Sequence, residues 1–442
     1  MFKNNSLPNK KLFHTIIASS VGTILEWYDF SLYIFFAPFF GVLFFPNKNH
    51  ATSVMLTYSV FAIGFIVRPI GAILFGHFGD RCGRKKALIT SLALMASTTC
   101  LIGMLPTYSQ IGIIAPGLLI FLRILQGISI GGETIGAGLF VIESAQKNKR
   151  GFATSLVWAS SGLGILLSSL AVTMVTFLFD HDELLKWGWR LPFLFGAITG
   201  VLGYFLRAHT TESTSFNSLK LSNNIVKYPL IEAIKNSKTR LLIAMGLYAL
   251  SVITTYLFFV FMPNYVSTTT GLALSVTMAV NTITMAVMVF LVPFFGSLSD
   301  KIGRRIILLL SGFGIIILAL PLFLLISTGA LIALIIAQLT FAILAAGFQG
   351  PITSAVLELF PVNTRYSAAA FSYGLSSSIF GGTTPLIALF LIHTMKSNIA
   401  PSMYLILGAV IAVISAMKMN ALKAEQIMLT NAQPDDSKFN II

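Results

Sequence analysis

Apolar residues fall in long, uninterrupted runs along the chain, separated by short polar stretches. Most runs reach about 20 residues or more, the length that a helix needs to cross a hydrocarbon core of about 30 Å. Backbone polar groups must be paired within lipid, so such runs form either helices or the strands of a closed barrel. The run at 307–318 does not alternate between polar and apolar residues, as barrel strands do, and therefore favours helices.

Twelve runs in two sets of six are predicted as transmembrane helices. The first set is expected at residues 14–44, 52–78, 87–106, 111–142, 152–178 and 190–207. A polar stretch, residues 209–238, separates it from the second set, expected at 240–266, 272–298, 306–326, 329–358, 366–392 and 400–420. The fold class is therefore an all-α membrane protein.

The composition agrees with a membrane protein, because 56% of the 442 residues are apolar and only 10% are charged. A soluble domain carries about 25% charged residues. The two cysteines, Cys82 and Cys100, form no readable disulfide framework, and we expect free thiols.

The net charge of +14 is explained by the loops in which the basic residues lie. If the N-terminus is cytoplasmic, most of the 29 lysines and arginines fall in cytoplasmic segments, including the stretch 207–240. Lys48, Lys186, Arg190 and Lys396 are the ones expected on the other side. Cytoplasmic loops carry the excess of basic residues in membrane proteins, so both termini are predicted to be cytoplasmic. The charge is then an orientation signal, and no nucleic-acid partner is expected.

One loop motif occurs twice, about half the chain length apart. The motif is Gly-x-x-x-Asp-(Arg/Lys)-x-Gly-Arg. Its first copy contains Gly76, Asp80, Arg81, Gly83 and Arg84. Its second copy contains Gly296, Asp300, Lys301, Gly303 and Arg304. A weaker repeat places an acid at the end of one helix and an arginine at the start of the next, as Glu143 with Arg150 and Glu358 with Arg365. Repeats of this kind imply two helix bundles with a solute path between them. We expect an N-terminal bundle at 1–208, a cytoplasmic loop at 209–239 and a C-terminal bundle at 240–442.

The repeated loops are candidates for a conformational lock. Asp80 is expected at a helix C-terminus, where the helix dipole disfavours a carboxylate unless cations neutralise it. Arg81, Arg84 and Lys85 are near enough in sequence to do so. Such a cluster can hold helix ends together in one conformation and release them in another. The alternative is that the basic residues only fix the topology.

Further motifs give the sequence a family resemblance. They are ASSVGTILEWYDF at 18–30, RPIG at 68–71, RILQGISIGGE at 123–133 and WGWRLPF at 187–193. With the repeated loop, they make the chain similar to the major facilitator superfamily, and within it to the metabolite:proton symporter family, which includes proline/betaine, α-ketoglutarate, shikimate and citrate transporters. The resemblance implies a symporter of the bacterial inner membrane that works by alternating access and takes up protons with its solute. We expect a monomer. We expect no cofactor and no metal, and the coupling ion is expected to be a proton.

A few ionisable residues lie within the predicted membrane helices. Each costs at least about 2.5–3.5 kcal/mol at mid-bilayer and is a functional candidate for that reason. Glu26 and Asp29 share one face of the first helix, a polar stripe that also includes Thr15, Ser19, Gly22 and Tyr33. Two carboxylates so close repel each other when both are ionised, so we predict that they carry the coupling proton, with Glu133 as a second candidate. The alternative is a static ion pair between the first and fourth helices.

Arg123 is the predicted binder of a substrate carboxylate, because its guanidinium can make two parallel hydrogen bonds. Its alternative role is a permanent partner of Glu26 or Asp29. Arg68 precedes a proline near the inner end of its helix and is assigned to the conformational group with the loop residues. Aromatic side chains can bind a quaternary ammonium group, and a polar side chain of the second half can complete the site; the candidates are Tyr33, Trp27, Tyr256 and Gln349.

The predicted function is proton-coupled import of a small carboxylate-bearing or zwitterionic metabolite, such as proline, betaine or an organic acid. One alternative is a proton-coupled antiporter that exports metabolites or drugs, but the fifth helix lacks the proline of the usual antiporter motif. A receptor or scaffold predicts a large soluble domain, and an enzyme predicts a nucleotide loop, metal spacing or nucleophile motif; the sequence contains none of them.

Overall fold

The computed structural model describes residues 7–47, 50–209, 212, 214–221 and 226–432, and this part of the chain contains helices but no strand. The first group of helices is α1 Leu7–Phe35, α2 Ala37–Phe44, α3 His50–Ile66, α4 Arg68–Cys82, α5 Arg84–Met104, α6 Tyr108–Ile111, α7 Ile114–Ser144, α8 Arg150–Leu178, α9 His181–Glu183 and α10 Arg190–Ala208. The second group is α13 Lys238–Tyr256, α14 Met262–Thr270, α15 Leu274–Ile302, α16 Arg304–Ser327, α17 Leu331–Leu357, α18 Arg365–Ser376, α19 Thr384–Met395 and α20 Pro401–Ala432.

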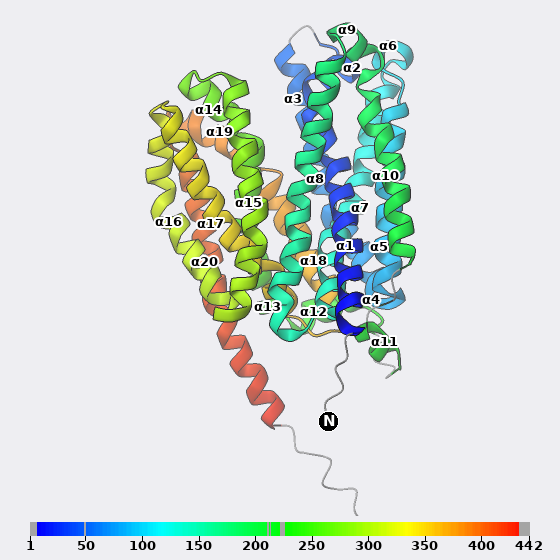
Figure 1. Cartoon of the computed structure of the whole chain (residues 1–442), viewed down its shortest axis with the longest axis vertical. Helices are drawn as coiled ribbons and strands as arrows, with labels where there is room; N and C mark the ends of the chain where they lie inside the picture. Colours follow the sequence, from blue (N-terminus) through cyan, green and yellow to red (C-terminus); the bar gives the residue numbers. More distant parts are fainter. Residues whose placement is uncertain (1–6, 48–49, 210–211, 213, 222–225, 433–442) are drawn as a thin grey trace, which may run out of the picture.

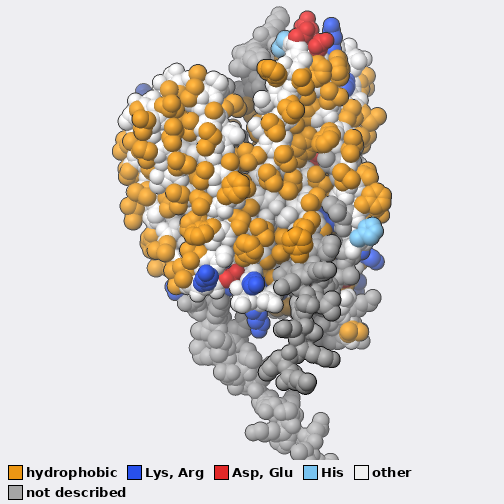
Figure 2. Space-filling view, in the orientation of Figure 1, with side chains coloured by type: hydrophobic (Ala, Val, Ile, Leu, Met, Phe, Trp, Pro, Cys, Tyr) orange, Lys and Arg blue, Asp and Glu red, His pale blue; other side chains and the backbone are white. Residues whose placement is uncertain are grey.

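The described residues contain ten helices that are long and apolar enough to cross a membrane. Hydrophobic side chains cover the middle of the molecule, while charged groups gather at its two ends (Figure 2). Large apolar side chains such as Phe290 and Ile317, near the middle of α15 and α16, are exposed. A bilayer covers an apolar belt of this kind, and the predicted all-helical membrane fold is confirmed.

Two of the expected helices are interrupted by proline. The span expected at 14–44 divides into α1 and α2, with Pro38 in the first turn of α2, and the span expected at 52–78 divides into α3 and α4, with Pro69 in the first turn of α4. Proline lacks the backbone N–H and disfavours helical geometry in the residue before it. The break places Arg68 at the first position of α4.

Two other expected helices each contain a π-helical turn. Leu257–Phe261 joins α13 to α14, and Ser377–Gly381 lies between α18 and α19. Such wider turns inside α-helices are frequent at functional sites. Both turns contribute residues to the region described below.

The two groups of helices stand side by side, and α11 Thr214–Leu221 and α12 Pro229–Asn236 lie at the end where α1 begins (Figure 1). Across the boundary, α8 packs on α15 and α17, while α18 packs on α4 and α7. The stretch expected to be a loop therefore contains two short helices. The second begins at Pro229, which suits a first helical turn, and packs on α4, α13 and α18.

Candidate functional site

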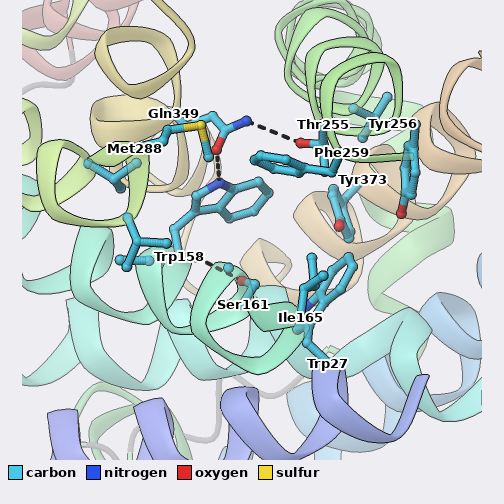
Figure 3. A pocket seen from close by; sticks show the side chains of 15 residues that line it. Trp27, Trp158, Ser161, Ile165, Thr255, Tyr256, Phe259, Met288, Gln349 and Tyr373 are labelled. Atoms are coloured by element: carbon cyan, nitrogen blue, oxygen red, sulfur yellow. Dashed lines mark hydrogen bonds between the residues drawn. The ribbon is translucent and has the colours of Figure 1, made fainter. Parts of the chain in front are cut away.

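A cavity lies between the two groups of helices (Figure 3). Five aromatic rings line it, namely Trp27 of α1, Trp158 of α8, Tyr256 of α13, Phe259 of the first π-helical turn and Tyr373 of α18. Among the described residues, the wall contains no charged side chain. An aromatic cavity of this kind suits a solute with an apolar or quaternary ammonium group.

Two hydrogen bonds cross this cavity wall. The indole Nε1 of Trp158 donates to Oε1 of Gln349 at 2.9 Å, and Nε2 of Gln349 donates to the hydroxyl of Thr255 at 3.1 Å (Figure 3). The first bond joins α8 to α17, so it links the two groups of helices. Three of the predicted solute-binding residues, Trp27, Tyr256 and Gln349, are thus brought together at one cavity.

Arg68 lies directly behind this wall. Its Nη1 donates to the hydroxyls of Ser377 at 2.7 Å and Tyr256 at 3.3 Å. The guanidinium stacks 3.9 Å from the ring centre of Phe65 and stands close to Tyr373. Its Nε and Nη2 have no hydrogen-bond partner among the described residues. The fully buried Arg68 guanidinium therefore has unsatisfied donors, and only one layer of side chains separates it from the cavity.

Arg123 and Tyr33 lie elsewhere, inside the first group of helices. Nη1 of Arg123 donates to Oε1 of Gln126 at 2.7 Å and to the carbonyl of Phe30 at 3.4 Å, and the guanidinium stacks 4.3 Å from the ring centre of Tyr33. The Tyr33 hydroxyl donates to the carbonyl of Thr57. Neither residue lines the cavity, and the described residues show no ion pair between Arg123 and either carboxylate of α1.

The polar stripe of α1 is buried along its whole length, from Thr15 to Tyr33. Glu26 and Asp29 are each only 1% exposed. Both oxygens of Glu26 are without a hydrogen-bond partner in the described part of the chain, and Thr99 is the polar neighbour of Asp29. The static ion pair with the fourth helix is therefore not observed. Glu26 is the sequence neighbour of Trp27, whose ring lines the cavity.

Glu133 is held by two partners from other helices. It accepts a hydrogen bond from Ser91 of α5 at 2.7 Å and forms an ion pair with Arg207, whose Nη1 also donates to the carbonyl of Leu88. Arg207 ends the helix expected at 190–207 and also counts among the cytoplasmic basic residues of 207–240, and the sequence does not predict its burial. Arg207 belongs to the last turn of α10 and is only 3% exposed.

The first copy of the repeated loop joins α4 to α18. Oδ2 of Asp80 accepts hydrogen bonds from the backbone N–H and the hydroxyl of Ser367, at 2.9 and 2.7 Å, while Oδ1 pairs with Arg84 at 3.0 Å. Gly76 leaves the space for this approach, because a side chain there would meet the backbone of Ser367. Asp80 ends its own helix, but it lies at the positive N-terminal end of α18, which favours its charge.

Of the three basic residues expected to neutralise Asp80, Arg84 forms the ion pair seen among the described residues. Arg81 is exposed, and Nζ of Lys85 donates to the carbonyl of Ala208 at 2.7 Å. Arg84 also lies 3.7 Å from Glu143 and donates to the carbonyl of Val362 in the other group of helices.

The second copy of the loop joins α15 to α8 in the same way. The carboxylate of Asp300 accepts hydrogen bonds from the backbone N–H groups of Gly151 and Phe152, at 2.8 and 2.9 Å. Arg304 pairs with Asp300 at 3.4 Å and with Glu358 at 2.9 Å, and Glu358 also pairs with Arg150 across the boundary at 3.5 Å. In both copies, a carboxylate at the end of one helix caps a helix of the opposite group.

The remaining residues of the predicted conformational group lie around these caps. Gly83 and Gly303 start α5 and α16 with φ of 112° and 99°, a backbone conformation that favours glycine. Nε of Arg365, the first residue of α18, donates to the carbonyl of Phe360 at 3.0 Å. The two copies together close the end of the molecule that carries α11 and α12.

Sequence reasoning missed three participants at these sites. Trp158 was hidden among ordinary apolar residues of its helix, and Arg207 among the basic residues expected in a loop. Glu212, in the stretch expected to be a loop, accepts hydrogen bonds from the backbone N–H groups of Arg84 and Lys85 and so caps α5. A Glu two residues before a short helix is too weak a signal to find this cap.

Two helical halves that enclose an aromatic cavity, and that are joined at one end by paired carboxylate caps, form the framework of a membrane transporter. The sequence comparisons establish the family. The family model for the Major Facilitator Superfamily matches residues 19–385 and 244–424, and the chain belongs to this superfamily.

Among its curated relatives are proline/betaine transporters of enteric bacteria. The one from Escherichia coli strain K12 is 32% identical over 419 residues, which cover 92% of this chain and 83% of that one. The one from Salmonella typhimurium is 32% identical over 418 residues, with 92% and 83% covered.

Solved structures of a sugar transporter share the fold. The proton:xylose symporter XylE bound to 6-bromo-6-deoxy-D-glucose superposes with a TM-score of 0.77 at 17% identity, covering 93% of this chain and 95% of that one. The inward open conformation of the xylose transporter XylE from E. coli gives a TM-score of 0.61 at 18% identity, with 92% and 95% covered. The recognised superfamily is thereby confirmed in both sequence and fold.

Proposed function

We propose that this protein is a proton-coupled symporter that imports a small carboxylate-bearing or zwitterionic solute, such as proline or betaine. The observation that carries the proposal is the aromatic cavity between the halves with the Arg68 guanidinium behind its wall. A quaternary or secondary ammonium group fits against aromatic rings, and a carboxylate fits the two free donors of a guanidinium. The relatives named as proline/betaine transporters support the same solute class.

The carboxylate-binding role belongs, in this proposal, to Arg68 and not to Arg123. Arg68 hydrogen-bonds to Tyr256, which lines the cavity from the second group of helices. The Arg68 guanidinium also lies over the ring of Trp27, which lines the cavity from the first group. Arg123 is surrounded by Gln126 and aromatic rings of its own half. Arg123 is then a residue that keeps the N-terminal half folded around its polar interior.

Transport occurs by alternating access between two bundles of six membrane helices. The helices α1 and α10 complete the ten recognised spans to twelve, and α1 packs on α7, α8 and α10. The end with α11 and α12 is cytoplasmic, both termini lie on that side, and the membrane is the bacterial inner membrane. The carboxylate caps at Asp80 and Asp300 then close the cytoplasmic side while the solute site is exposed to the outside.

Protons couple to the solute through Glu26 and Asp29. A buried carboxylate without a hydrogen-bond partner is stable when it is protonated, and Glu26, the sequence neighbour of Trp27, is in that position. No metal or organic cofactor is proposed.

The test is uptake by purified protein in liposomes under an imposed pH gradient, alkaline inside, with radiolabelled glycine betaine, proline, α-ketoglutarate, shikimate and citrate. We expect accumulation of betaine or proline that disappears when the gradient is collapsed. Trp158→Ala should raise KM by about tenfold, because it removes a ring that contributes up to about 2 kcal/mol of cation–π attraction together with its packing. Trp158→Phe should have a smaller effect, since it retains a ring.

Trp187→Ala is the matched control, because Trp187 is 45% exposed and lies outside the cavity wall. Accumulation only with the gradient reversed would support the exporter instead, and unchanged KM in Trp158→Ala would remove the cavity from the solute site.

A further inference from the structure

Arg207 is a buried cation placed between two buried acids. Its guanidinium forms the ion pair with Glu133 of α7, and it also rests against α1 at Gly22. A methyl group on Gly22 would overlap this guanidinium, so the glycine is what allows the close approach. Gly22 lies four residues before Glu26, on the same face of α1, and Arg207 is therefore one helical turn from the carboxylate of Glu26.

The two acids differ in how well they are satisfied. Glu133 has Ser91 and Arg207 as partners, whereas both oxygens of Glu26 have none among the described residues. A guanidinium offers five donors in a fixed fork and can pair with either carboxylate, but its single charge neutralises only one of them. The observed arrangement thus matches an ionised Glu133 and a protonated Glu26.

The charged and titratable groups around this cluster come from several helices. The groups that act on Glu26 are Asp29 of α1, Arg68 of α4, Glu133 of α7, Arg207 of α10 and Tyr373 of α18. Those that act on Glu133 include Tyr366 of α18. A small cavity, lined by Ser19, Lys85 and Arg207 among others, lies beside the guanidinium.

We propose that Arg207 is a counter-ion shared by Glu26 and Glu133, and that its exchange between them moves the coupling proton inward. The inference rests on the proposed proton-coupled function. In one state Glu26 carries the proton and Arg207 pairs with ionised Glu133. In the other state Glu26 is ionised and pairs with Arg207, and Glu133 carries the proton.

The step balances in charge and atoms. The O–H bond of Glu26 breaks and one O–H bond forms on Glu133, directly or through one water, while the guanidinium shifts in the opposite sense. Each state has one neutral acid and one neutralised pair, so no uncompensated charge is left in the membrane interior.

Glu133 is also next to the contact that closes the cytoplasmic end. The carbonyl of Gly132 accepts a hydrogen bond from the Tyr366 hydroxyl at 2.9 Å, and Tyr366 precedes Ser367, the partner of Asp80. The Glu133–Arg207 pair therefore lies beside the Tyr366–Gly132 and Ser367–Asp80 contacts, which must break for inward opening. Arrival of the proton at Glu133 would favour release of that end.

Infrared spectroscopy tests the shared counter-ion without any transported solute. The carboxylic acid C=O stretch of buried acids is recorded in the purified protein with Asp29→Asn, which removes the neighbouring acid of α1. We expect a band that Glu26→Gln abolishes. Glu133→Gln should also abolish it, because Arg207 then pairs with Glu26 and ionises it. The double variant Glu133→Gln/Arg207→Gln should restore it, because no cation remains to share.

Arg190→Gln, at the other end of α10, is the matched control and should leave the band unchanged. A Glu26 band that is absent from the Asp29→Asn protein, or that survives in Glu133→Gln, would overturn the proposal.

Transport provides a second test that changes no charge. Gly22→Ala pushes the guanidinium away from α1, so we expect pH-driven accumulation of radiolabelled glycine betaine to fall about tenfold. Counterflow, which needs no net proton movement, should persist. Full pH-driven accumulation in Gly22→Ala would contradict the exchange. If the unmodified protein shows no pH-driven uptake, the proposed function fails, and the infrared pattern still decides the role of Arg207.

Discussion

Asp80 at the end of α4 accepts two hydrogen bonds from Ser367 in the first turn of α18, one from the backbone N–H at 2.9 Å and one from the hydroxyl at 2.7 Å. This relationship joins the two halves of the transporter through a single carboxylate. Asp300 does the same for α8 through two backbone N–H groups. The repeated sequence motif thus corresponds to a repeated contact, in which each half caps a helix of the other.

Asp80→Asn should impair transport while the protein still reaches the membrane. Hydrogen bonds to a charged group contribute about 1.5–3 kcal/mol, and the amide also leaves Arg84 without its nearest carboxylate. We expect the initial rate of uptake to fall about tenfold or more, since each 1.4 kcal/mol corresponds to a factor of ten. Asp300→Asn should do less, because Asp300 is more exposed than the buried Asp80 and the mid-membrane charges lie in the first half.

Asp182→Asn, at an exposed site in α9, is the matched control for both variants. Full activity of Asp80→Asn and Asp300→Asn alike would mean that the loops only fix the topology.

The orientation can be tested by thiol labelling. Lys186 and Lys235 lie in segments at opposite ends of the molecule, next to α9 and within α12 (Figure 1). In a background with Cys82→Ser and Cys100→Ser, a cysteine replacing Lys186 should react with an impermeant reagent added to intact cells, and one replacing Lys235 should not. The opposite pattern would reverse the topology.

Helix positions and the polar stripe of α1 could be predicted from the sequence, because membrane helices are specified by local hydrophobicity. The contact partners could not. Arg207 lies at the end of an apolar run, where a basic residue normally marks a cytoplasmic loop, and only the packing of α10 against α5 and α1 shows that it is buried. Likewise, Pro69 marks the helix break beside Arg68, but only the tertiary structure shows that Arg68 lies behind the cavity wall, hydrogen-bonded to Tyr256.

The roles of Arg68 and Arg123 can be distinguished by measuring the affinity for the solute. Arg68→Lys keeps the charge but loses the planar fork, and we expect KM for the transported solute to rise about tenfold, because a bidentate contact becomes a single one. Arg123→Lys should change KM much less and act mainly on stability, since its guanidinium stacks between Phe30 and Tyr33. Equilibrium binding by tryptophan fluorescence or calorimetry checks both. If Arg123→Lys loses affinity for the solute while Arg68→Lys binds it normally, Arg123 and not Arg68 binds the solute carboxylate.

The proposed coupling role of Glu26 and Asp29 is tested by separating proton movement from solute movement. Glu26→Gln and Asp29→Asn resemble the protonated acids in shape and charge, but they cannot release a proton. Both side chains are buried on one face of α1. Each variant should therefore lose accumulation driven by the pH gradient, and at least one should keep exchange between equal solute pools, which requires binding and rocking only.

The most direct measurement is counterflow in liposomes recorded beside uptake under an imposed pH gradient, for unmodified protein, Glu26→Gln and Asp29→Asn. We predict that both variants lose gradient-driven accumulation. At least one of them should retain counterflow. Full gradient-driven accumulation in both variants would contradict proton coupling at α1, and loss of counterflow in both would show that these acids bind solute or hold the fold.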